Sequence, residues 1–305
     1  MAKGTKELKQ RITGVKNIQQ ITRAMEMVAT QKLMRLQTRA DAARPFSAKI
    51  QEMVGRLAGS VRSDLSPLLA DRDVETVGNL IVTSDKGMCG GYNMNLVRYA
   101  MATMDGDADG SSAEGGSDGP APGQRIHVLG NKGDVLLRAR KRIVDLKYDD
   151  VVEKIDYTRI RTIARELVAD FLDGKIDRLR IIYTAFISAG RQRPAAVTIL
   201  PIEPAELIAE GDEGDGAESE LDFIVEPDEE ALLKELLPKF LEIKVYSAVL
   251  ESLASEFTAR RNAMKQATDA ADDMIGALRR QYNRARQESI TSELLEVSSG
   301  AEALK

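Results

Sequence analysis

The sequence predicts an α+β protein in which both ends of the chain form long helices and the middle forms a small sheet covered by helices. Apolar residues recur at helical spacing over both ends, and strand-like runs alternate with helix-like runs between residues 75 and 228. Aromatic residues are only 4% of the 305 residues, so Leu and Met supply apolar side chains in their place, and this composition suits long helices. We therefore expect an N-terminal helical segment at 1–60, an α/β domain at 75–228 and a C-terminal helical segment at 229–305.

The N-terminal segment carries one apolar stripe in steps of three and four residues. Such spacing places the side chains on one face of a helix. The residues of this stripe are Leu8, Ile12, Val15, Ile18, Ile21, Met25 and Val28. Because a residue that precedes proline disfavours helical geometry, we expect an end or kink at Arg44-Pro45 and a second helix over 46–57.

The C-terminal segment repeats the pattern after Pro238, which predicts a helix from Lys239 to Val297. Its stripe comprises Val245, Val249, Leu253, Phe257, Met264, Ala267, Ala271, Met274, Leu278, Tyr282 and Ala285. A helix of that length cannot bury its apolar stripe against itself. The economical partner is the N-terminal helix, so the two ends are predicted to form an antiparallel coiled coil.

The middle of the chain alternates between strand and helix patterns. Strands are predicted at 79–83, 125–129, 143–147, 179–187 and 196–200, and helices at 93–104, 134–140 and 158–172. Two acidic segments rich in Gly, Ser or Ala, at 105–123 and 209–222, are expected to be surface insertions that belong to no core.

The net charge of −5 hides an uneven distribution. Five acids lie between Asp105 and Gly123 and thirteen between Glu203 and Glu230, and neither segment holds a Lys or Arg. Without these two segments, 43 basic residues face 30 acidic ones. A basic body suggests an anionic partner such as nucleic acid, lipid headgroups or an acidic protein surface, although solvated helix faces give the same pattern.

Residues that could perform chemistry are few. The Gly-rich run from Ser84 to Asn93 follows a predicted strand but matches neither phosphate-binding spacing, so it is interpreted as a tight strand-to-helix turn. Cys89 and His127 are the single Cys and the single His, and both are expected to be structural. No set of side chains offers a nucleophile, a base and an oxyanion site together. We therefore expect no catalytic, cofactor-binding or metal site.

Four blocks of sequence, in order along the chain, resemble the gamma subunits of F-type ATP synthases. They are Ile18–Ala29, Ser84–Asn93, Tyr246–Ala259 leading into Ala263–Asp269, and Tyr282–Gln287 with the residues from Ile290 to Leu294. The resemblance implies a Rossmann-like, three-layer middle domain. It also implies that the chain is a non-catalytic central rotor shaft, present once per complex, which couples ion flow to changes at catalytic sites on other subunits. The implied partners are the alpha and beta subunits, the epsilon subunit and the membrane c ring, and the implied place is the cytoplasmic face of a bacterial membrane.

The resemblance also implies which residues contact those partners. Met25, Arg286 and Gln287 match positions that face the alpha/beta hexamer, and the segment 221–226, with Leu221, Phe223 and Val225, matches a region near the c ring. The two acidic insertions depart from the family pattern. No membrane-inserted segment and no contact with nucleic acid are implied.

Two other functions remain open from the residues alone. A structural coiled-coil protein could dock on nucleic acid or on a membrane through its basic helices, and would then bind DNA or anionic vesicles in a salt-sensitive way. A dinucleotide-dependent enzyme could be built on the α/β middle, and would then be stabilised by its ligand.

Overall fold

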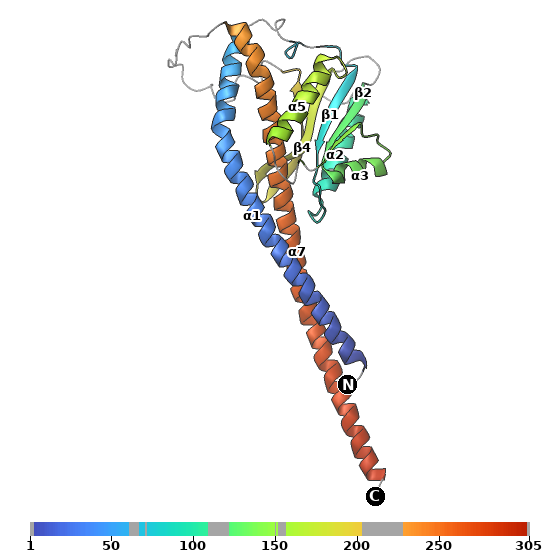
Figure 1. Cartoon of the computed structure of the whole chain (residues 1–305). Helices are drawn as coiled ribbons and strands as arrows, with labels where there is room; N and C mark the ends of the chain where they lie inside the picture. The colour runs from blue at the N-terminus through green and yellow to red at the C-terminus, as the bar shows by residue number, and fades with distance from the viewer. Residues whose placement is uncertain are drawn as a thin grey trace. The chain divides into compact units, whose positions relative to one another are not determined.

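The computed structural model describes residues 3–60, 67–70, 72–108, 122–149, 151, 157–202 and 228–303. The chain divides into two compact units. We call residues 1–31 with 259–305 the rod unit, and residues 32–258 the sheet unit. The expected α+β class is confirmed, with long terminal helices and a central sheet (Figure 1).

Helix α1 runs without interruption from Lys3 to Ser60, with Pro45 inside it. The predicted break at Arg44-Pro45 is therefore wrong. Pro45 lies on the exposed face of the helix, while Ile50, Val54 and Leu57 further along are buried. Burial of each such side chain contributes about 1.5–3 kcal/mol, and together they outweigh the roughly 3 kcal/mol that an interior proline costs.

Helix α7 spans Glu229–Ala303 and also contains a proline, Pro238. It begins ten residues before the predicted start at Lys239. Asp228 caps it, since its carboxylate oxygen accepts a hydrogen bond of 2.7 Å from the N–H of Ala231. Leu233, Leu236 and Leu237 are buried in the first turns, so packing again carries the helix through a proline.

The sheet unit is built on five strands in the order β3-β2-β1-β4-β5. Strands β1 (Thr76–Val82), β2 (Gly123–Leu129), β3 (Leu146–Tyr148) and β4 (Arg178–Ser188) run parallel, and β5 (Arg191–Leu200) pairs antiparallel with β4. Six of the seven β1 residues are buried, as expected for a parallel strand covered on both faces.

Helices cover the sheet as the three-layer prediction requires. Helices α2 (Tyr92–Ala108) and α3 (Asn131–Ala139) lie on one face, and α5 (Tyr157–Leu172) lies on the other (Figure 1). The core under α2 and α3 comprises Ile81, Leu96, Val97, Ala100, Met104, Ile126, Val128, Leu137, Val144 and Ile182. Ile160, Ile163, Ala164, Leu167 and Phe171 form the buried face of α5.

Two predicted boundaries in the middle of the chain are wrong. The strand predicted at 143–147 begins only at Leu146, and Ile143 is 81% exposed. Asp145 sets that start, because it exchanges hydrogen bonds with the backbone of Ile126. The insertion predicted at 105–123 is too long at both ends, because residues 105–108 belong to α2 and Gly123 is the first residue of β2. The second insertion, 209–222, lies outside the described residues.

The rod unit is an antiparallel pair formed by the start of α1 and the end of α7 (Figure 1). The hydroxyls of Thr22 and Thr268 lie 2.8 Å apart, and the amide of Gln19 donates to the carboxylate of Asp272 at 2.5 Å. Gln19 lies three residues before Thr22 on α1, whereas its partner Asp272 lies four residues after Thr268 on α7, so the two helices run in opposite directions. The predicted antiparallel pairing of the chain ends is confirmed here.

Candidate partner-binding surface

The seam of the rod unit follows a strict three-four spacing. On α1 the series consists of Thr5, Leu8, Ile12, Val15, Gln19, Thr22, Glu26 and Ala29, all of them buried or half-buried; Met25 and Thr30 beside it are half-buried as well. On α7 the series consists of Met264, Thr268, Ala271, Ile275, Leu278, Tyr282, Ala285 and Ser289, all of them buried or half-buried, while residues 259–263, Ala267, Gly276 and Ala277 beside it are half-buried as well. Each series repeats every seven residues, which is the pattern of a two-stranded coiled coil.

The seam leaves several apolar residues on the surface of the rod. Ile18, Ile21 and Val28 were predicted to lie in the seam, but they are 55%, 59% and 53% exposed. Each precedes a seam position by one residue, so together with the half-buried Met25 they form a second stripe beside the seam. We call these four residues the α1 outer stripe. Met274, also predicted to lie in the seam, is 54% exposed, because Ile275 takes its place.

An apolar stripe on the surface of a helix is unusual unless another molecule covers it. A single exposed Ile is ordinary, but residues at 18, 21, 25 and 28 share one face of the helix. Every described side chain of α7 between Thr291 and Ser299 is exposed as well, including Leu294, Leu295 and Val297. The rod unit thus presents apolar surface that a partner could bury.

Arg286 and Gln287 lie on the exposed side of α7. Neighbouring Arg284 forms an ion pair of 3.0 Å with Glu288, one turn away. Together with Thr291, Ser292 and Leu295, three of these residues (Arg284, Gln287 and Glu288) line an open groove of about 540 Å³. The groove offers a guanidinium, a carboxylate, an amide and two hydroxyls, which suits hydrogen bonding to a polar loop.

The structure does not bring Met25 close to Arg286 and Gln287. The Thr22–Thr268 pair places Met25 level with about residue 265 of α7. The two sites are then separated by roughly 20 residues of helix, or about 30 Å at 1.5 Å per residue. They would contact different parts of any partner. Leu221, Phe223 and Val225 lie outside the described residues.

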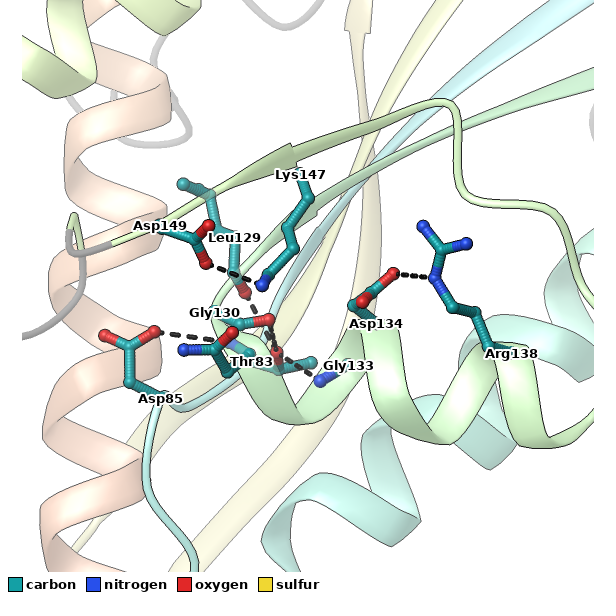
Figure 2. A network of polar contacts seen from close by, with 10 residues as sticks. Thr83, Asp85, Leu129, Gly130, Gly133, Asp134, Arg138, Lys147 and Asp149 are labelled. Atoms are coloured by element: carbon teal, nitrogen blue, oxygen red, sulfur yellow. Dashed lines mark hydrogen bonds and ion pairs between the residues drawn. The ribbon is translucent and has the colours of Figure 1, made fainter.

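A Rossmann-like fold has several helix N-termini at the carboxyl ends of its strands, and in this chain the one that follows β2 is occupied by the chain's own atoms. Such folds bind phosphate at a helix N-terminus beyond the carboxyl ends of the strands. The first strand-to-helix turn, where such folds carry their phosphate-binding glycines, leads into α2, whereas α3 follows β2. The first three N–H groups of α3 donate to the Asp85 carboxylate at 3.2 Å, the Ser84 carbonyl at 3.0 Å and the Thr83 hydroxyl at 2.9 Å. Figure 2 shows the contacts of Thr83 and Asp85 in this network, in which the Thr83 hydroxyl also donates to the carbonyls of Leu129 and Gly130.

The packing beneath that network is tight. A Cβ atom placed on Gly130 would lie 2.4 Å from the Thr83 carbonyl oxygen, and one on Gly133 would lie 2.7 Å from the Thr83 side chain. The surrounding ion pairs, Lys147 with Asp149 and Asp134 with Arg138, are also closed within the chain. Within the described part of the chain, no group of three or more His, Cys, Asp or Glu residues could hold a metal ion.

Comparison with known proteins assigns a family. A family model described as ATP synthase matches residues 4–304. The ATP synthase gamma chain of Moorella thermoacetica is 40% identical over 301 residues, which cover 98% of this chain and 99% of that one. The chain belongs to the ATP synthase gamma chain family.

Other gamma chains and solved structures agree with this assignment. The gamma chain of Geotalea daltonii is 39% identical over 98% of both chains. A chain from the Euglena gracilis mitochondrial ATP synthase, in a structure of OSCP, F1 and the c-ring, superimposes with a TM-score of 0.65 at 20% identity and covers 99% of this chain and 94% of that one. A chain in a structure of the rotor of the same enzyme superimposes with a TM-score of 0.61 at 20% identity and covers 94% of this chain and 99% of that one. These likenesses show a shared fold.

Sequence reasoning missed the polar part of the gamma chain seam. Gln19, Thr22, Thr268 and Asp272 hold the register of the rod unit, but a search for apolar spacing passes over them. The seam could have been located from the strict three-four series that runs from Thr5 to Ala29, because that series includes polar as well as apolar residues. No helix in the described residues of this gamma chain is long and apolar enough to cross a membrane.

Proposed function

We propose that this chain is the central shaft of a rotary ATP synthase. In this role it couples ion flow through a membrane c ring to conformational change at catalytic sites on an alpha/beta hexamer. The observation that carries the proposal is membership of the gamma chain family over 98% of the chain, together with a coiled coil that carries a stripe of exposed apolar residues.

The geometry suits mechanical work. A heptad-paired rod resists bending and keeps its register, and a single asymmetric pair of helices presents a different side to each of three surrounding sites. One copy per complex follows, because a threefold-symmetric shaft would bias all three sites equally. The α1 outer stripe, including Met25, and the groove around Gln287 with the adjacent Arg286 are the proposed contacts with the hexamer. Leu221, Phe223 and Val225 are the proposed contacts on the c-ring side, where the epsilon subunit also binds.

A non-catalytic role is part of the proposal. The glycine run before α2 matches neither phosphate-binding spacing, and the N-terminus of α3 is capped by Thr83, Ser84 and Asp85, so nucleotide chemistry is assigned to the other subunits. These two observations argue against the dinucleotide-enzyme alternative. The proposed place of the chain is peripheral, at the cytoplasmic face of a bacterial membrane, held there by its partners.

Rotation can be tested with a probe on the sheet unit. Cys89 is buried, so a new surface thiol at the β4–β5 turn, Ala189→Cys, is expected to take a label selectively. The chain is assembled with alpha, beta and epsilon subunits, the hexamer is fixed to glass, and a bead is attached at position 189. The expected result is unidirectional rotation of the bead when ATP is added.

Two results would overturn the proposal. One is failure of the chain to assemble with alpha and beta subunits. The other is an assembled, ATP-hydrolysing complex in which the bead does not turn. Salt-sensitive binding of the purified chain to DNA or to anionic vesicles, without assembly, would favour the coiled-coil docking alternative instead.

A further inference from the structure

The Gly-rich turn between β1 and α2 closes on itself. Met88 and Gly90 adopt left-handed backbone conformations, with φ of 65° and 59°. The Asn93 side chain accepts a hydrogen bond of 3.0 Å from the Ser84 N–H, and it donates to the Ser84 hydroxyl at 2.7 Å and to the Cys89 sulfur at 3.2 Å. These contacts fix the first turn of α2 and therefore the position of Tyr92 next to Asn93.

The Tyr92 side chain reaches from this turn to helix α7. It is only 8% exposed, and its hydroxyl lies 2.7 Å from the Ser252 hydroxyl and donates to the Ser252 carbonyl at 3.1 Å. Burial raises the pKa of Tyr92 well above its ordinary value, so the hydroxyl keeps its proton. The turn and α7 are thus joined by a directional contact.

Ser252 ties the same point of α7 to two strands. It has no exposed surface, and its hydroxyl donates to the Val82 carbonyl of β1 at 3.3 Å and accepts from the Thr184 N–H of β4 at 3.4 Å. Its neighbours on the buried face, Val249 and Leu253, are apolar. A hydroxyl in such a place lowers stability unless it is fully bonded, so its presence calls for a reason.

We propose that the hydroxyl pair of Tyr92 and Ser252 is a rotational lock that prevents α7 from turning about its own axis against the sheet. Apolar packing holds a helix on a sheet but is non-directional, so it resists rotation weakly. Hydrogen bonds require alignment and weaken steeply when it is lost. Bonds from one serine to α2, β1 and β4 therefore fix the angle of the helix. This role deepens the proposed shaft function and rests on it.

The test uses the assembled complex with a bead at Ala189→Cys and the hexamer stalled without nucleotide. The spread of bead angles reports the torsional stiffness between the sheet unit and the hexamer. Tyr92→Phe and Ser252→Ala remove single hydroxyls, and each is expected to lose stiffness. Because the two hydroxyls share one contact, the double variant should lose less than the sum of the two single losses.

Matched controls separate a lock from general weakening. Ser255→Ala removes a buried hydroxyl on the same helix that has no hydrogen-bond partner among the described residues. Tyr99→Phe removes the hydroxyl of a tyrosine on α2 whose side chain is 37% exposed. Neither control should change the angular spread. Thermal unfolding of each variant is measured in parallel.

Each outcome of this experiment either supports or overturns a named proposal. A wider angular spread and fewer ions pumped per ATP, in the lock variants but not in the controls, support the lock. Lock variants with the same spread as the controls overturn it, even if their melting temperatures fall, because that result leaves only a structural role. If the unmodified complex does not rotate, the shaft function itself fails, and that failure is seen before any variant is made.

Discussion

Thr22 of α1 and Thr268 of α7 hold their hydroxyl oxygens 2.8 Å apart inside the seam of the rod unit. One hydroxyl donates across the seam, and the other can donate to its own helix, at Gln19 O (3.0 Å) or Met264 O (2.9 Å). Next to this pair, Gln19 reaches Asp272. Polar residues at seam positions cost stability but select one register and one orientation of the helices.

The first prediction follows from that pair. Thr22→Val keeps the shape but removes a hydroxyl, and it should lower the free energy of unfolding by about 0.5–1.5 kcal/mol. Adding Thr268→Val removes both partners, so the double variant should lose less than the sum of the single losses. Denaturant unfolding of the full chain measures this. Thr13→Val is the control, because Thr13 is exposed and its hydroxyl donates to its own helix, at Lys9 O. Strictly additive losses would show that the two hydroxyls do not interact.

The second prediction concerns the α1 outer stripe. Ile21→Ser should change the stability of the free chain by less than about 0.5 kcal/mol, because Ile21 is 59% exposed. The same change should weaken binding to the alpha/beta hexamer about tenfold, because burying an Ile contributes about 1.5–3 kcal/mol. Gln20→Ser, at an exposed polar position on the same helix, is the control. Titration of the labelled chain with the hexamer gives both affinities, and equal affinity for the two variants would contradict a contact at the stripe.

The third prediction concerns the groove on α7. Arg286→Ala combined with Gln287→Ala should leave ATP hydrolysis measurable but lower the number of ions pumped per ATP in membrane vesicles. Loss of hydrogen bonds to a charged group costs about 1.5–3 kcal/mol, enough to weaken a contact ten- to hundredfold. Arg279→Ala is the control, since Arg279 is exposed on the same helix and lies outside the groove. Normal pumping per ATP in the double variant would refute the proposed contact.

The limits of the sequence are clearest where packing overrides a local preference. Spacing alone located every strand and the long helices of the described residues. It failed at Pro45 and Pro238, where buried residues on both sides hold the helix together. It also placed Ile18 and Ile21 in the seam, because an apolar residue at helical spacing was taken as buried. The packing of the partner helix determines which of two neighbouring stripes is buried. Here it buries the stripe that contains Gln19 and Thr22 and leaves the stripe with Ile18 and Ile21 exposed.

The proposed contact residues show a second limit. Exposure of Arg286 and Gln287 agrees with a binding role, but their assignment to the hexamer came from family resemblance and remains a prediction. The network around Thr83 was partly foreseeable, since the glycine run at 84–91 matches no phosphate-binding spacing. Contacts such as Tyr92 with Ser252 join residues 160 positions apart, and no local pattern predicts them.

The fourth prediction uses His127, the single histidine of the chain. It lies fully buried on β2, stacked 6.4 Å from the Tyr148 ring, and neither ring nitrogen has a hydrogen-bond partner among the described residues. Burial lowers its pKa below the ordinary value, and Arg125 adds to this, against the weaker opposing effects of Asp170, Asp145 and Glu166. The folded chain therefore holds His127 neutral where the unfolded chain already binds a proton.

The sign of the pH effect follows from that difference. Below the unfolded pKa of roughly 6.5, stability should fall with falling pH by up to about 1.4 kcal/mol per pH unit, until the folded pKa is reached. His127→Leu removes the only imidazole, so the unfolding free energy of the variant minus that of the wild type should increase as the pH falls from 7 to 5. Carboxylates titrate in both proteins and cancel in that difference. A constant difference across this range would mean that His127 titrates normally in the folded sheet unit.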